Sequence, residues 1–135
     1  MKTAGYSGTP LHKKLGIKAG DKVWFSGNPE MYESELLKAG NIEVVPKLTL
    51  GFDFLHFFTS SQKDLSRTFP KLRKALKPDG MAWISWPKKA SGMKSDLDEN
   101  IVRELGLKNG LVDVKVCAVD NVWSGLKFVF RLKDR

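Results

Sequence analysis

Three short apolar runs constrain the fold of this chain more than any other feature of its sequence. They are Lys22–Ser26 (KVWFS), Phe52–Phe58 (FDFLHFF) and Met81–Trp86 (MAWISW). Each has the length of a strand, and the second is apolar on both faces, as in a strand that helices cover on both sides. Strands that alternate with helices form parallel sheets with right-handed crossovers. The sequence therefore predicts an α/β fold.

Capping residues and apolar spacing predict the helices between and after these runs. The predicted helical segments are Thr9–Gly16, Glu30–Lys38, Ser61–Lys77 and Asp96–Leu107. Ser60 or Ser61 is expected to cap the third helix, and Asp96 is expected to cap the fourth. Pro70 interrupts the third helix and predicts a kink. We interpret Pro78-Asp79-Gly80 as a turn before the third strand.

Three shorter segments complete the predicted sheet. Ile42–Val45 is expected to form a strand of uncertain direction, because Pro46–Gly51 is too short for a helical crossover. Val112–Val119 and Leu126–Leu132 are expected to pair antiparallel as a terminal hairpin. We predict four parallel strands in the order Ile42–Val45, Lys22–Ser26, Phe52–Phe58 and Met81–Trp86. The hairpin is expected to extend this sheet, with its last strand beside Met81–Trp86.

Longer segments resemble the class I methyltransferases. Leu15–Val23 (LGIKAGDKV) is similar to the approach to their first strand, Phe52–Leu55 to their fourth strand, and Leu76–Ser85 (LKPDGMAWIS) to the passage into their fifth. The resemblance implies a three-layer Rossmann-like sheet, mostly parallel, with a C-terminal antiparallel hairpin. One βα unit of that sheet is missing, so the domain, residues 1–135, resembles a shortened methyltransferase.

Three further segments resemble an uncharacterised bacterial family of unknown function. They are Tyr6–Leu11 (YSGTPL), Ser85–Gly92 (SWPKKASG) and Lys115–Phe128 (KVCAVDNVWSGLKF). This resemblance implies no activity.

The methyltransferase resemblance also implies cofactor-binding residues that this chain lacks. A glycine-rich loop and a carboxylate normally follow the first strand, and a second carboxylate ends the second strand and binds the ribose. Phe25 and Pro29 stand in place of the first carboxylate and a glycine, Val45-Pro46 stands at the second position, and Gly27 alone is retained. These replacements predict that S-adenosylmethionine is unlikely as a cofactor, and we predict no other cofactor.

Polar residues gather where ligands bind in open α/β sheets, beyond the carboxyl ends of the strands. Lys88 and Lys89 follow a buried strand directly, and two ammonium groups suit a small anion. The alternative is a pair of solvated surface lysines. The ligand-binding residues predicted at this edge are Ser26, Asn28, Thr59, Ser60, Lys88, Lys89 and Ser91.

The loop between the two hairpin strands is a second candidate. Asp120, Trp123, Ser124 and Lys127 could form a polar pocket with an aromatic wall. Alternatively, Asp120 ties the loop to its own backbone and Trp123 packs as a lid, which is common for aspartate in loops.

The net charge of +8 raises the possibility of an anionic partner. Residues 51–95 hold nine Lys and Arg but only three Asp and Glu. Four of these basic residues share one face of the predicted third helix, namely Lys63, Arg67, Lys71 and Lys74. A solvated outer face explains them best, so we expect nucleic acid to bind weakly and non-specifically, if at all.

The remaining features exclude several classes of protein. No apolar stretch is long enough to span a membrane, and residues 1–10 lack the apolar core of a signal peptide, so we expect a cytoplasmic protein. One cysteine and two histidines give no metal site, and His56 is interpreted as a buried, hydrogen-bonded residue. The leading interpretation is a non-catalytic domain that binds a small anion or a protein partner. The alternatives are an S-adenosylmethionine-dependent methyltransferase with an altered cofactor site and a nucleic-acid accessory domain.

Overall fold

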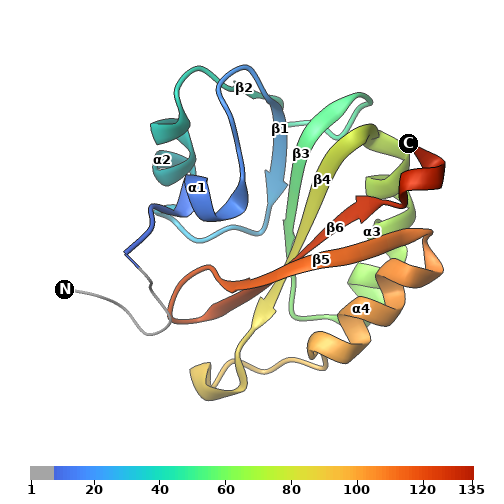
Figure 1. Cartoon of the computed structure of the whole chain (residues 1–135). Helices are drawn as coiled ribbons and strands as arrows, with labels where there is room; N and C mark the ends of the chain where they lie inside the picture. The colour runs from blue at the N-terminus through green and yellow to red at the C-terminus, as the bar shows by residue number, and fades with distance from the viewer. Residues whose placement is uncertain (1–7) are drawn as a thin grey trace.

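A computed structural model describes residues 8–135, so Tyr6 and Ser7 of the YSGTPL segment lie outside the described residues. Within that range the strands form one mixed sheet in the order β2-β1-β3-β4-β6-β5 (Figure 1). The strands are β1 (Lys22–Ser26), β2 (Glu43–Val44), β3 (Phe52–Phe58), β4 (Leu76–Pro87), β5 (Leu111–Ala118) and β6 (Trp123–Phe130).

The strand order confirms the predicted topology. β2, β1, β3 and β4 are parallel, and β6 runs antiparallel beside β4 with β5 outside it. The uncertain direction of the second strand is settled by the pairing of Val23 with Val44, which is parallel. The α/β class and the terminal hairpin therefore follow the prediction, and β1 lies inside the sheet.

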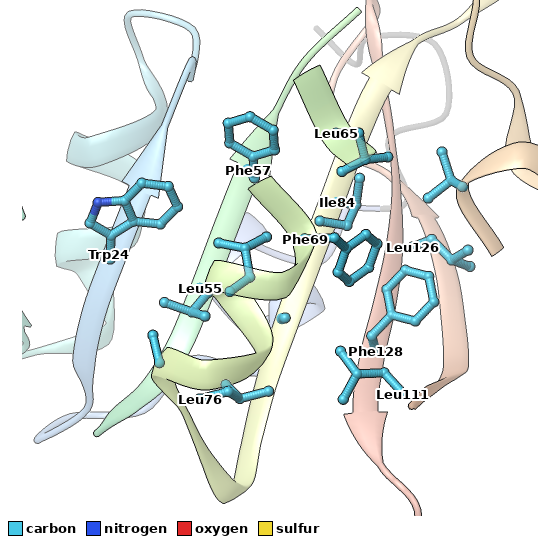
Figure 2. Close-up of a cluster of buried hydrophobic side chains, with 14 of the residues drawn as sticks. Trp24, Leu55, Phe57, Leu65, Phe69, Leu76, Ile84, Leu111, Leu126 and Phe128 are labelled. Carbon is cyan, nitrogen blue, oxygen red and sulfur yellow. The ribbon is translucent and has the colours of Figure 1, made fainter. Parts of the chain in front are cut away.

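Helices cover both faces of the sheet, each over its own group of buried side chains. Helices α3 (Gln62–Ala75) and α4 (Glu99–Lys108) cover one face. Phe69 of α3 meets Phe128 of β6 there, edge to face, with 5.4 Å between ring centroids (Figure 2). Helices α1 (Leu11–Leu15) and α2 (Tyr32–Leu36) cover the other face, where Leu15 is fully buried. The 3-10 turns are η1 (Leu37–Ala39), η2 (Lys89–Ser91) and η3 (Leu132–Asp134).

The segment predicted as a turn before the third apolar run is part of a strand. β4 begins at Leu76, which pairs with Phe52, and the register then shifts so that Phe54 pairs with Met81. Pro78, Asp79 and Gly80, which were predicted as a turn, lie in this irregular part of β4. Gly80 permits it, because a Cβ there would lie 2.9 Å from the carbonyl oxygen of Phe52.

The helix caps also differ from the prediction. Asp98 caps α4 by accepting a hydrogen bond from the Ile101 amide at 2.9 Å. The predicted cap, Asp96, instead accepts one from the Gln62 amide at 2.7 Å, at the N-terminus of α3. Ser61 caps α3 as expected. No helix in the described part of the chain has the length and apolar character needed to cross a membrane.

Candidate functional site

The carboxyl ends of β1, β3 and β4 meet at one edge of the sheet, the lower edge in Figure 1, together with the turn of the β5–β6 hairpin. The loop after β1 presses closely on the end of β3. Gly27 has a φ of +75°, and a Cβ there would lie 2.3 Å from the carbonyl oxygen of Phe58. The glycine retained from the methyltransferase pattern thus packs against β3 and leaves no open cradle for a ligand.

A cavity of about 220 Å³ lies beside this loop, on the α1–α2 face. It is lined by Leu11, Pro29, Glu30, Met31, Tyr32, Glu35, Val119 and Asp120. Three carboxylates therefore surround an otherwise largely apolar space in a protein of net charge +8. Carboxylates accept hydrogen bonds and favour positive charge, so the cavity suits a ligand with a cationic group or hydroxyl groups.

The carboxylates are partly engaged by their own surroundings. One oxygen of Asp120 accepts hydrogen bonds from the amides of Val122 and Trp123, both at 2.8 Å. Glu35 pairs with Lys38 at 2.5 Å on the exposed side of α2. Glu30 is exposed at the mouth of the cavity. Asp120 is thus held in a fixed position by the hairpin turn, and none of the described residues donates a hydrogen bond to its second oxygen.

Tyr32 forms part of the cavity wall and joins it to a buried polar chain. Its hydroxyl lies 2.5 Å from His56 Nδ1, and His56 Nε2 lies 2.7 Å from Ser85 Oγ. Burial lowers the pKa of His56 well below its ordinary value and raises the pKa of Tyr32 well above its own. His56 is therefore the buried, hydrogen-bonded residue that the sequence predicted, and its lowered pKa favours the neutral form.

The predicted residues at the ends of β1 and β3 are brought to one edge, but several are used by the fold. The Thr59 hydroxyl donates to Asp64 at 3.1 Å and accepts from the Ser61 amide at 3.2 Å. The Ser60 carbonyl accepts hydrogen bonds from the loop that precedes α4. Ser26 is the last residue of β1, and Asn28 lies in the loop after it, next to Pro29 of the cavity lining. Their role in binding stays a prediction.

The loop that carries Lys88 and Lys89 is attached to the hairpin. The Lys88 amide donates to the Val122 carbonyl at 2.7 Å, and the Ser91 hydroxyl donates to the Lys88 carbonyl at 2.7 Å. Lys88 is half-buried and Lys89 is exposed. Among the described residues, neither ammonium group forms an ion pair. The loop is therefore attached to the hairpin turn that carries Asp120, and the Ser91 hydroxyl is already occupied by the Lys88 carbonyl.

The four residues predicted to form a pocket at the hairpin do not line one common cavity. Asp120 lines the cavity, and the Trp123 ring packs edge to face on Phe58 with 5.3 Å between centroids. Ser124 lies within β6, opposite Trp86. Lys127 lies further along β6, paired with Trp83, and does not line the cavity. Burial, followed by the nearby Lys115 and Lys18, lowers the pKa of Lys127.

Sequence reasoning missed Glu30 and Glu35. Glu30 lies in the turn between β1 and α2, and Glu35 lies on α2, which follows that turn. The methyltransferase pattern places a glycine-rich loop and a carboxylate at fixed positions, and neither glutamate occupies one of these positions.

Solved structures similar to this chain are methyltransferases. An O-methyltransferase of neocarzinostatin biosynthesis, in complex with S-adenosylmethionine, matches with a TM-score of 0.64 and 14% identity over 83% of this chain and 49% of its own. Magnesium protoporphyrin IX methyltransferase from Synechocystis PCC 6803, with bound S-adenosylmethionine, matches with a TM-score of 0.61 and 11% identity, over 89% of this chain and 74% of its own. Precorrin-6y C5,15-methyltransferase from Geobacter metallireducens GS-15 matches with a TM-score of 0.56 and 12% identity, over 90% of this chain and 86% of its own.

At these identities the likeness shows the fold: this chain has a methyltransferase-like α/β fold. It spans about half the length of the O-methyltransferase, at 49%. No protein-family model and no curated protein sequence matches the chain. The resemblance of three segments to a bacterial family of unknown function therefore stays without support from a family model.

The comparisons correct one expectation. We expected S-adenosylmethionine to be unlikely as a cofactor, and this is wrong, because proteins of the same fold hold it. The expectation depended on three replaced positions, whereas an open α/β sheet places ligands at its carboxyl edge through the arrangement of all its strand-end loops.

Proposed function

We propose that this domain binds S-adenosylmethionine at the carboxyl edge of its sheet and serves a methyltransferase reaction. The observation that carries the proposal is the carboxylate-lined cavity beside the loop after β1, at the edge where α/β sheets take their ligands. When bound, the cofactor supplies an electrophilic methyl group on a sulfonium centre. The fold alone supports many functions, so the proposal depends on the cavity.

The residues of the cavity fit one part of this cofactor. The ammonium group and the ribose hydroxyls of the cofactor donate hydrogen bonds, which Glu30 and Asp120 can accept. The sulfonium of the cofactor is a cation, which the same two carboxylates can stabilise. Leu11 and Val119 of the same lining offer apolar contact. The loop at Gly27 fits less well, because the space beside the Gly27 Cα is already filled by the Phe58 carbonyl of β3. We therefore assign the polar contacts to the two carboxylates.

The test is calorimetry with S-adenosylmethionine and S-adenosylhomocysteine on the wild type and on a Glu30→Gln/Asp120→Asn variant. We expect the variant to lose at least about tenfold in affinity for the sulfonium ligand, which corresponds to about 1.4 kcal/mol. The loss should be smaller for the neutral thioether, because the carboxylates favour the positive charge. Glu33→Gln, an exposed change on α2 away from the cavity, is the matched control. Absence of binding of either compound at millimolar concentration would refute the proposal.

A second candidate function is binding of a small anion at residues 87–91. Its support is the attachment of Lys88 to the hairpin turn that also carries Asp120 of the cavity. An anionic group of a second ligand could then bind to Lys88 and Lys89 while its remainder reaches the cavity. This site combines with the first in a methyltransferase that acts on an anionic acceptor.

A further inference from the structure

A groove of about 580 Å³ lies on the α3 face of the sheet, opposite the face that holds the cavity. It is lined by Lys47, Leu48, Thr49 and Leu50 of the β2–β3 connector and by Lys71 and Lys74 of α3. Leu48 packs against the buried cluster that contains Trp24. The groove exists because an extended connector takes the place of a helical crossover between β2 and β3.

Lysines stand on both walls of this groove. Lys71 and Lys74 are exposed on α3, and Lys47 is exposed on the connector. In the described part of the chain, no ion pair or side-chain hydrogen bond engages these three ammonium groups. Their charge is therefore not neutralised within the fold.

The positive charge continues along the helix beyond the groove. Lys63 and Arg67 precede Lys71 and Lys74 on α3, and successive members of this set are four, four and three residues apart. The four side chains therefore lie on one stripe of the helix. With a rise of about 1.5 Å per residue, the stripe is about 16 Å long. Arg67 is paired with Asp64 at 2.8 Å, so the stripe is strongest at its C-terminal end, where the groove lies.

We propose that the groove and the stripe bind the phosphodiester backbone of a nucleic acid strand, without preference for sequence. A line of cations with a lysine on the facing wall matches the charge of a phosphate chain. None of the described residues that line the groove is aromatic, so bases cannot stack there, and lysine ammonium groups contact phosphates without identifying bases. This proposal is independent of methyl transfer, because the two surfaces lie on opposite faces.

The test is fluorescence anisotropy with labelled 20-nucleotide oligouridylate and oligothymidylate at several salt concentrations. Three or four contacted phosphates give an expected slope of log K against log salt of about −2 to −3. Removal of two of these contacts by Lys71→Gln/Lys74→Gln should bring the slope closer to zero by about 1.4. Lys13→Gln/Lys115→Gln removes two exposed charges on the α1 side and is the matched control. Both variants are checked for folding by thermal denaturation.

Three results would overturn the proposal. The first is a slope that Lys71→Gln/Lys74→Gln leaves unchanged, or that the control variant changes equally. The second is a preference of more than tenfold for one sequence among mixed oligonucleotides, which requires base contacts that the groove does not offer. The third is displacement of the oligonucleotide by polyglutamate at equal charge concentration, which would identify the groove as a surface for acidic polypeptides.

Discussion

The hydroxyl of Tyr32 lies 2.5 Å from Nδ1 of His56, in a place where neither side chain is more than 1% exposed. His56 Nε2 continues the chain to Ser85, so hydrogen bonds join α2 to the two central strands. Buried polar groups are costly unless all their partners are present. This arrangement therefore makes the fold sensitive to the protonation of one histidine.

The first prediction is that the free energy of unfolding falls as the pH drops from 7 to 5. The pKa of His56 in the folded protein is lowered by burial, well below the ordinary value of 6.5. The unfolded chain binds the proton near pH 6.5, so the stabilisation is complete above that pH and is lost below it. For a single proton the slope reaches at most about 1.4 kcal/mol per pH unit.

Urea denaturation of the wild type and of His56→Gln between pH 5 and 8 measures this effect. The variant should be less stable at pH 7 and should show a flatter dependence on pH in this range. Equal slopes in the two proteins would assign the pH dependence to another group.

The second prediction concerns Gly106, inside α4. Helix propensity alone favours alanine there by about 1 kcal/mol. A Cβ at this position would lie 2.1 Å from Cε1 of Phe128, a fully buried ring that packs on Phe69. We expect Gly106→Ala to lower the free energy of unfolding by about 1–3 kcal/mol. Lys108→Ala, an exposed change on the same helix, is the control for helix propensity. Thermal denaturation measures both variants, and a higher melting temperature for Gly106→Ala than for the wild type would contradict the packing argument.

The third prediction compares the two members of the Asp53–Lys77 ion pair. Asp53 accepts a hydrogen bond from the Lys22 amide at 2.8 Å as well as from Lys77 at 2.9 Å. Burial acts to raise the pKa of Asp53, but the hydrogen bonds from the Lys22 amide and Lys77 outweigh it and lower the pKa below 3.8. The carboxylate thus stabilises the fold above that pH and loses this contribution in acid.

In urea denaturation at pH 7, Asp53→Ala should therefore lower the free energy of unfolding more than Lys77→Ala does. The first change deprives the Lys22 amide of its acceptor, at about 1–2 kcal/mol, whereas an exposed ion pair contributes at most about 1 kcal/mol. Equal losses in the two variants would mean that the amide finds another acceptor.

The fourth prediction is that phosphate or sulfate raises the melting temperature of the wild type more than that of Lys88→Ala/Lys89→Ala. A bound anion stabilises the folded state in proportion to the logarithm of its concentration once the site is saturated. Lys108→Ala/Lys133→Ala removes the same charge from exposed positions elsewhere and serves as the control. If both double variants respond to the anion as the wild type does, Lys88 and Lys89 are surface charges and the anion site is refuted.

The order of the sheet was predictable because local patterns encode it. Apolar runs such as Phe52–Phe58 can only be buried strands, and the handedness of crossovers then allows few arrangements. The strand boundaries were less accurate. Leu76 pairs with Phe52, and the proline, aspartate and glycine that follow it lie in an irregular part of β4, because pairing with a neighbouring strand overrides the turn preference of these residues.

The cavity was decided by the tertiary structure alone. Glu30 follows β1 and Asp120 follows β5, about 90 residues later in the chain, and no local pattern relates them. They line one space because β6 pairs with β4 and β1 with β3, which brings the hairpin turn to the edge where β1 ends. The same holds for Asp96, which accepts a hydrogen bond from the Gln62 amide at the start of α3 although it lies in a loop beyond β4. Periodicity and capping act over a few residues, whereas a site of this kind depends on which strands become neighbours.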